Sequence, residues 1–316
     1  MGLSSTPRRA LLVTALTPVV WGTTYLVTAM LLPPGRPLLA AAVRALPAGL
    51  LLVAMTRRRP FGPWWWRSIV LGALHFGAFF PLLFIAAYRL PGGVAAVVGA
   101  VGPLATLVLA HLLVDERVTT RRLVSGVSAV VGVGMVSLGA GFGVDGVGVA
   151  AALAGTVSMS LGAVLVKRWG RPEGVEALAF TSWQLVAGGL MLAPLAVGVE
   201  GPLPAIDGAA LLGFSWLSLV GTAIAYWLWF RGIEQLEVSA VTFLGLLSPV
   251  TATILGWLVL GEVLTVVQSL GMVVALGASA AGALGPGRGS SGPSPQVSAR
   301  ARRGPWPPPR RSRAAA

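Results

Sequence analysis

The sequence has no cysteine, and only 10% of its residues are charged. The lack of cysteine excludes disulfides, cysteine metal sites and thiol catalysis. A soluble domain carries about 25% charged residues, so this chain has too few charges to cover a water-facing surface. Acidic residues are scarcer than basic ones, 10 against 23, and Lys167 is the only lysine. These absences point to a chain whose surroundings are mostly apolar.

Apolar sequence is abundant instead, at 55% of the residues and a mean hydropathy of +0.83. It forms runs of about 20 residues, the length that crosses a bilayer as a helix. The first run is longer than a signal-peptide core of about 7–15 residues, so we expect an uncleaved helix there. We predict an all-α integral membrane protein with ten spans, at 10–32, 37–56, 68–90, 92–114, 123–141, 147–166, 175–199, 209–230, 239–260 and 266–284.

The arginines test this count of helices. With the N-terminus inside, every inside segment carries Arg or Lys, whereas the outside loops hold only Arg36 and Arg89. Cytoplasmic loops have this excess of positive charge, and one missed helix would invert every later loop. The pattern therefore predicts a multi-pass protein of the cell (inner or plasma) membrane with both termini cytoplasmic. It also explains the net charge of +13 without nucleic-acid binding.

The segment 287–316 differs from the rest, because it is rich in Pro, Gly, Ser and Arg and has no apolar period. Such a segment cannot bury enough surface to fold, so we expect a disordered, basic cytoplasmic tail. Its arginines favour contact with membrane lipids of negative charge.

An internal repeat relates 79–119 to 225–265 without a gap. Its most informative pairs are Pro103 with Pro249 and Glu116 with Glu262. With five helices in each unit, the second unit must cross the membrane in the opposite sense to the first. Inverted repeats of this kind are common in secondary transporters, where the substrate site lies near the midplane between them. We predict repeats at 1–142 and 143–286.

The chain resembles the drug/metabolite transporter (DMT) superfamily, specifically its EamA-type permeases, over residues 10–285. The motifs that carry the resemblance are Trp21-Gly22-Thr23-Thr24-Tyr25, Arg44, Val101-Gly102-Pro103 with Asp115-Glu116-Arg117-Val118-Thr119, and Leu247-Ser248-Pro249 with Leu260-Gly261-Glu262-Val263-Leu264-Thr265. The resemblance implies ten helices in two inverted repeats and the export of metabolites, amino acids or drugs. One departure is Ser158-Met159-Ser160, where the family often carries a tryptophan. That wall of any pocket is therefore not defined by the resemblance.

Several polar or aromatic residues inside the predicted spans are candidates for substrate binding. Arg44 lies about 12 Å into its span, where a charge is costly and faces a cavity or a partner. Two interpretations stay open for it: contact with an anionic or carboxylate group, or a structural arginine that either bonds to helix-end carbonyls or snorkels to the membrane surface. The other candidates are Trp21, Thr24, Tyr25, His75, Trp183, Gln184, Tyr226 and Ser248.

No Asp or Glu falls in the middle of a predicted span, although proton-coupled carriers often use a buried carboxylate. Proton coupling through His75 is one hypothesis, and a neutral structural histidine is the alternative. Pro103 and Pro249 are expected to kink their helices, either as fixed bends or as hinges. Glu116 and Glu262 are expected to brace the helix ends or to act in gating.

These features favour a secondary transporter, predicted to be an exporter, that moves small molecules by alternating access. A non-transporting membrane scaffold with the same fold is the alternative. Nucleophile-elbow, zinc-protease and Walker motifs are absent from the sequence, so no enzyme activity, cofactor or metal is expected. Substrate identity, coupling ion and oligomeric state are not predicted.

Overall fold

The computed structural model describes residues 5–138, 145–233 and 244–283, and all regular elements in these ranges are helical. The predicted tail, and the first residues of the predicted span 239–260, lie outside the described residues. The elements are α1 (Ser5–Leu31), α2 (Pro37–Thr56), α3 (Trp64–Gly72), η1 (Ala73–Ala78), α4 (Phe79–Arg89), α5 (Gly92–Val98), η2 (Gly99–Val101), α6 (Gly102–Val114), α7 (Thr120–Leu138), α8 (Gly146–Trp169), α9 (Ala177–Glu200), α10 (Gly208–Ser215), η4 (Trp216–Ile224), α11 (Ala225–Ile233), α13 (Leu247–Leu260) and α14 (Val266–Ala283).

The prediction of an all-helical membrane protein with ten helices is confirmed. Three spans are composite, because α3, η1 and α4 run on as one helix, as do α5, η2 and α6, and α10, η4 and α11. Within the described ranges, seven helices are long and apolar enough to cross a bilayer, and α13 and α14 are shorter apolar helices. The tenth, α7, carries Arg121 and Arg122 in its first turn, which lowers its hydropathy.

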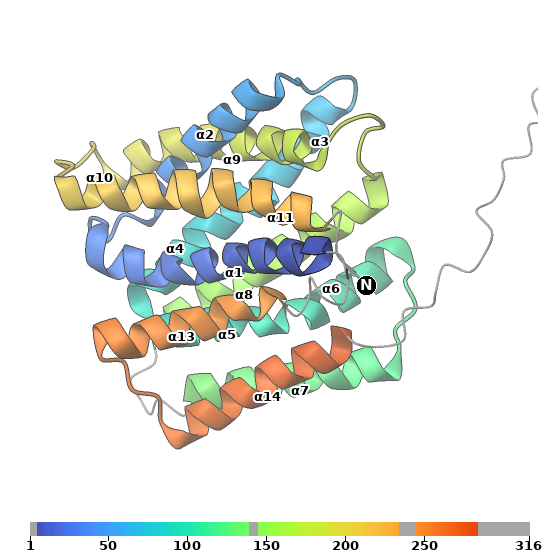
Figure 1. Ribbon diagram of the computed structural model, residues 1–316, viewed down its shortest axis with the longest axis vertical. Helices are drawn as coiled ribbons and strands as arrows, with labels where there is room; N and C mark the ends of the chain where they lie inside the picture. The colour runs from blue at the N-terminus through green and yellow to red at the C-terminus, as the bar shows by residue number, and fades with distance from the viewer. Residues whose placement is uncertain (1–4, 139–144, 234–243, 284–316) are drawn as a thin grey trace, which may run out of the picture. The chain divides into compact units, whose positions relative to one another are not determined.

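The packing of the helices follows the inverted repeat. The second helix of each repeat packs on its equivalent, α2 on α9, and the fifth does the same, α7 on α14 (Figure 1). The first helix of each repeat packs on the third and fourth helices of the other repeat. Thus α1 contacts α11 and α13, and α8 contacts α4 and α6. Exchanging the two repeats leaves this set of contacts unchanged, as a pseudo-two-fold axis requires.

Glycines mark the closest approaches between equivalent helices. A Cβ on Gly49 would lie 2.8 Å from the Val186 nitrogen, and one on Gly189 would lie 2.7 Å from the Leu46 Cβ. A weaker part of the repeat aligns 44–49 with 184–189, so Leu46 and Gly49 correspond to Val186 and Gly189. Small residues let membrane helices approach closely, where packing rather than burial from water drives association. In the α2–α9 contact, each repeat therefore places a glycine against the equivalent residue of the other repeat.

Two π-helical segments, η1 and η4, interrupt the third helix of each repeat. They end at equivalent positions, immediately before Phe79 and Ala225, the first aligned pair of the repeat. A π turn leaves backbone carbonyls without their usual i→i−4 donors, and here side chains from the first helix of the other repeat supply donors. Ser158 donates to the Leu74 carbonyl at 2.8 Å, and Trp21 donates to the Gly221 carbonyl at 3.1 Å.

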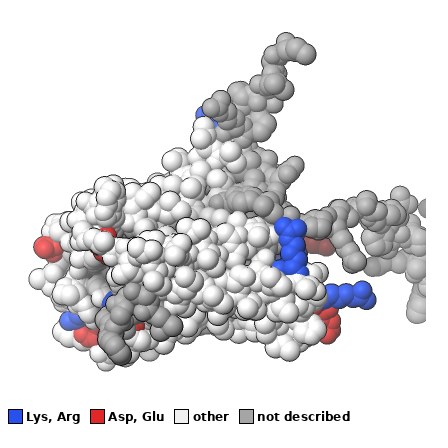
Figure 2. Space-filling model, turned by 90° about the horizontal axis from the view of Figure 1, so that it is seen from below, with Lys and Arg blue, Asp and Glu red and all other residues white. Residues whose placement is uncertain are grey.

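The main apolar core lies where α2, α4, α9 and η4 meet, and its largest fully buried side chains are Leu52, Phe80, Phe84, Leu185, Leu192 and Leu217. Apolar side chains are also widely exposed, as on the surface of α14, which is expected of helices that face lipid. Charged side chains gather toward the two ends of the face seen in Figure 2, with uncharged surface between them. This belt is the surface that a bilayer core would cover.

Candidate functional site

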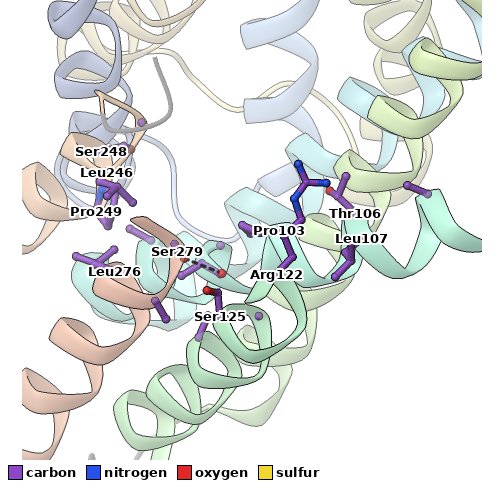
Figure 3. Close-up of a pocket in the computed structure, with 18 of the residues that line it drawn as sticks. Pro103, Thr106, Leu107, Arg122, Ser125, Leu246, Ser248, Pro249, Leu276 and Ser279 are labelled. Carbon is purple, nitrogen blue, oxygen red and sulfur yellow. Dashed lines mark hydrogen bonds between the residues drawn. The ribbon is translucent and has the colours of Figure 1, made fainter. Parts of the chain in front are cut away.

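A cavity of about 670 Å³ lies between the fourth and fifth helices of the two repeats. Its walls come from α5, η2 and α6 with α7 on one side, and from α13 with α14 on the other. Small-molecule pockets have volumes of about 300–1,000 Å³, so the cavity is large enough for a metabolite or a drug. Figure 3 shows Pro249 and Ser248 on one wall, Pro103 and Thr106 on another, and Ser125 between them.

The two proline helices create this space. Proline lacks the backbone N–H that would bond to the carbonyl four residues earlier, and its ring crowds that carbonyl. Before Pro103 the helix tightens into the 3₁₀ turn η2, where the Gly102 N–H bonds to the Gly99 carbonyl. Pro249 follows a turn at Leu246 that precedes α13. Pro103, Pro249, Gly99 and its equivalent Gly245 all line the cavity.

The cavity wall is mainly apolar, with hydroxyl groups spaced around it. Ser279 is already bonded, because its hydroxyl donates to the carbonyls of Ala100 and Ala275 at 3.2 and 2.9 Å. Thr106, Ser125 and Ser248 also line the cavity, and their hydroxyls form no hydrogen bond within the described part of the chain. An apolar wall with a few polar groups is the usual form of a small-molecule site.

One end of the cavity carries an ion cluster centred on Glu116, which is itself a lining residue. Its carboxylate accepts hydrogen bonds from Lys167 at 2.5 Å and from Arg122 at 3.1 Å. The hydrogen bond from Lys167, reinforced by Arg122, lowers the pKa of Glu116 below its ordinary value. The cluster ties the ends of α6, α7 and α8 together, and its two cations exceed its single carboxylate.

At the other end of α13, the two proline helices are in direct contact. Both carboxylate oxygens of Glu262 lie 3.1 Å from the Gly92 N–H at the start of α5. A Cβ on Gly93 would lie 2.6 Å from the Thr253 hydroxyl. A carboxylate at a helix N-terminus is stabilised by the unpaired N–H groups and by the helix dipole. The described helices α5 and α13 are therefore closed together at this end.

Arg44 lies outside this cavity, in the packing between α1, α2 and η4. Its guanidinium donates to the Thr222 hydroxyl at 3.2 Å, the Thr24 hydroxyl at 3.4 Å and the Gly221 carbonyl at 3.5 Å. It also lies over the Phe80 ring at 4.6 Å. Only 4% of Arg44 is exposed, and neutral oxygens and an aromatic face surround its charge. These partners are two hydroxyls and a carbonyl inside η4, not helix-end carbonyls, and both interpretations of Arg44 stay predictions.

The predicted aromatic residues of both halves meet beside Arg44. The rings of Trp21 and Tyr226 are 5.6 Å apart, and those of Tyr226 and Phe76 are 6.1 Å apart. Tyr25, one turn after Trp21 on α1, packs against the start of α5 at Gly92 and the core beside it. The structure thus gathers Trp21, Thr24, Arg44 and Tyr226 around η4.

His75 and Gln184 form a pair in η1 and α9, with 2.8 Å between the His75 Nδ1 and the Gln184 Oε1. The Gln184 amide nitrogen donates to the Phe180 carbonyl at 3.2 Å, which fixes the amide oxygen toward the histidine. The His75 Nδ1 faces this oxygen, and its Nε2 faces Gly162, where an added Cβ would come within 2.2 Å. The proton-coupling hypothesis for His75 stays a prediction.

Trp183, predicted with Gln184 as a substrate residue, points elsewhere. Its indole N–H donates to the Arg58 carbonyl at 2.8 Å, and its ring stands edge-on to Phe61 and Phe180. It fastens the α2–α3 connection to α9. The structure therefore gives Trp183 an anchoring contact, while Ser248, Pro103, Pro249 and Glu116 line the cavity.

Two carboxylates cap helices: the contact of Glu200 was not predicted from the sequence, whereas Glu262 was expected to brace a helix end, although its partner was not predicted. Glu200 accepts from the Leu38 and Leu39 N–H groups at 2.6 and 3.0 Å, and so caps α2 from the end of α9. Glu262 caps α5 in the same way. The only signal in the sequence was a lone carboxylate at the end of an apolar run, which does not identify the helix that it caps.

Ten membrane helices in two inverted repeats, with a cavity between the repeats, define a multi-pass membrane transporter. A family comparison agrees with this class. The chain belongs to the EamA-like transporter family, whose model matches residues 8–138 and 146–281, within the DMT superfamily. This is a family of transporters, not of enzymes.

Individual relatives span nearly the same length. Protein PecM of Dickeya dadantii is 43% identical over 257 residues, covering 81% of this chain and 86% of that protein. The uncharacterized inner membrane transporter YedA of Escherichia coli K12 is 30% identical over 270 residues, covering 81% and 85%. A solved crystal structure superimposes with a TM-score of 0.60 at 22% identity, covering 87% of this chain and 96% of that one, which supports the fold alone.

Proposed function

We propose that this transporter is a secondary carrier that exports small metabolites, amino acids or drugs by alternating access. The observation that supports this best is the cavity between Pro103 and Pro249. It is bounded by equivalent helices of two inverted repeats, which close together at the Glu262 end. A carrier needs such a site with one end shut, and the repeat supplies a second arrangement of nearly equal energy.

The proposed motion opens the contact between α5 and α13. The Glu262–Gly92 hydrogen bonds and the Gly93–Thr253 contact would break, while the walls of the cavity approach each other at the Glu116 end. The kinks at Pro103 and Pro249 would act as hinges, because the missing backbone hydrogen bonds lower the cost of bending there. The self-complementary α2–α9 packing would stay intact and hold the two repeats together.

The substrate would bind among the hydroxyls of Thr106, Ser125 and Ser248. Because these groups both donate and accept, and the walls are apolar, we expect a small amphiphilic molecule. The helices that move relative to this site would be held together by the packing of Arg44, Trp21 and Tyr226 around η4. Proton coupling would run through His75. In the cell, the protein would lie in the inner or plasma membrane with both termini cytoplasmic, in line with the arginine distribution.

The test is flux in liposomes that contain the purified protein and a pooled panel of labelled amino acids and amphiphilic drugs. We expect saturable flux that falls at least tenfold in the double variant Thr106→Ala, Ser248→Ala. The matched control is Ser269→Ala, which removes an exposed hydroxyl of α14 that bonds only to the Thr265 carbonyl.

The opposite results are informative in different ways. Flux that survives in the double variant would move the substrate site away from the cavity. Folded, correctly inserted protein that transports no compound, and in which single cysteines placed in the cavity do not react with thiol reagents, would favour the scaffold function.

A further inference from the structure

A cluster of one arginine and three tryptophans lies around the first turn of α3, and none of its residues lines the cavity. The guanidinium of Arg67 lies over three indole rings, those of Trp64 at 5.0 Å, Trp66 at 5.6 Å and Trp169 at 5.5 Å. The rings of Trp66 and Trp169 are themselves 5.1 Å apart and nearly perpendicular. We call Arg67 and these three tryptophans the indole cage.

The charge in the indole cage has no partner of opposite sign. The ion pairs formed within the described ranges do not include Arg67. Its Nε is buried and makes no hydrogen bond there. The two terminal nitrogens of Arg67 also make no hydrogen bond within the described ranges. They are not buried, so they reach the surface. A charged guanidinium without an acceptor is costly near the membrane, so the terminal nitrogens of Arg67 favour an acceptor from outside the chain.

The surroundings of the cage are strongly basic. The α2–α3 connection contributes an exposed run of arginines, and the end of α8 contributes two more: Arg57, Arg58, Arg59, Arg168 and Arg171. Contacts hold both connections beside the cage, since the Arg58 carbonyl is bonded to Trp183 and the Trp64 ring packs on Phe180. The α8–α9 connection also carries two exposed carboxylates, Glu173 and Glu176. With Arg67, these segments therefore hold six arginines and two carboxylates.

Beside the charge, the surface is apolar. Trp65 is 57% exposed, Trp66 is 50% exposed, and Ile69, one turn further along α3, is 48% exposed. Aromatic side chains of this kind sit at the boundary between headgroups and hydrocarbon. A free anion would use only the charged half of this surface. A phospholipid would place its phosphate on the arginines and lay its acyl chains along the exposed side of α3.

We propose that the indole cage is a binding site for the phosphate group of an anionic phospholipid. Arginine matches phosphate with two parallel N–H···O bonds, which lysine cannot reproduce. The indole faces hold the guanidinium plane so that its open edge points outward. The proposal does not depend on what the protein transports, because the cage and the cavity share no lining residue.

The test uses delipidated full-length protein in detergent and measures thermal unfolding as lipid is added. The probes are phosphatidylglycerol, phosphatidylcholine and inorganic phosphate, and native mass spectrometry counts the bound lipid. We expect phosphatidylglycerol to stabilise the wild type, phosphatidylcholine to act more weakly, and millimolar phosphate to have no effect. In Arg67→Gln, the concentration of phosphatidylglycerol needed should rise at least tenfold, as for the loss of a charge-assisted pair.

The matched control is Arg117→Gln, which removes the same charge from an exposed arginine after α6 that lies outside the cage. It should bind phosphatidylglycerol as the wild type does. If Arg67→Gln does not fold, Arg67→Lys keeps the charge, and its affinity should still fall several-fold because the forked geometry is lost. Equal losses in the Arg67 and Arg117 variants, wild-type affinity in Arg67→Lys, or full competition by inorganic phosphate would each overturn the proposal.

Discussion

The contact between Glu262 and Gly92 gives a direct test of the proposed closed end. Changing Glu262 to Gln keeps the shape of the side chain but removes its charge from the N-terminus of α5. A hydrogen bond to a charged group contributes about 1.5–3 kcal/mol against about 1 for a neutral one, and the helix dipole adds about 0.3–1. Because Glu262 is partly exposed, we expect the closed arrangement to lose about 1 kcal/mol, or about fivefold in population.

The assay follows from the lack of cysteine in the sequence. A single cysteine at Thr253, whose hydroxyl packs against Gly93 in the closed end, has no background labelling. In purified protein, its rate of reaction with a polar maleimide reports how often this end opens. We expect that rate to rise about fivefold when Glu262→Gln is added, as the population shift requires.

The control is Glu200→Gln, the same substitution in a second carboxylate that caps a helix, α2, through Leu38 and Leu39. It should leave labelling at position 253 unchanged, because that cap joins α9 to α2 and not α5 to α13. An unchanged rate in Glu262→Gln would refute the reasoning. An equal rise in both variants would show general loosening of the helix ends and not a gate.

Three further predictions rest on other contacts. Gly132→Ala should lower the free energy of unfolding by about 1–3 kcal/mol, because the added Cβ would lie 2.5 Å from the Ala275 nitrogen. The control is Gly134→Ala, whose Cβ would have no neighbouring atom within 4 Å and which should be neutral in the same unfolding assay. Arg44→Ala should lower the melting temperature and reduce flux at least tenfold, since it strips donors from Thr24, Thr222 and the Gly221 carbonyl; a stable, active variant would contradict this. The Glu116 cluster should stabilise the fold by less than about 1 kcal/mol, being largely exposed. Because the pKa of Glu116 is lowered from its ordinary 4.5, that contribution is present above pH 4.5 and lost as the pH falls through the lower folded pKa. Unfolding curves of the wild type and Glu116→Gln should therefore converge in acid.

The number and order of the helices could be predicted because they depend on local properties of the sequence. Runs such as 37–56 and 92–114 are long enough to span a bilayer, and their ends agree with α2 and with α5–α6. The repeat could be predicted because Pro103 and Pro249 are rare enough in apolar sequence to fix an alignment. The π segments could not, since η1 and η4 depend on donors from helices on the other repeat, as Ser158 and Trp21 show.

The candidate site could be predicted only in part, and the reason is again the distance between partners in the sequence. Pro103, Pro249, Ser248 and Glu116 line the cavity, and each lies in or beside the duplicated segment. For Arg44, the sequence indicates a costly buried charge but not the residues that surround it, which come from α1 and η4. An isolated tryptophan such as Trp183 is equally ambiguous, because its hydrogen bond to the Arg58 carbonyl depends on how a loop folds back.

The inverted repeat separates contacts that hold the fold from contacts that define one state of it. Where the symmetry is obeyed, as at Gly49 and Gly189, the contact maps onto itself when the repeats exchange roles, so it can persist through a transport cycle. Where it is broken, the contact would belong to one state of the proposed alternating-access cycle. The clearest break is at the paired glutamates, since Glu262 caps α5 while Glu116 is paired with Lys167 and Arg122. Two residues that the repeat makes equivalent thus have different partners at the two ends of the proline helices. A motion that opens one end and closes the other must change the partners of both, and substitutions there should shift the balance of states without unfolding the core.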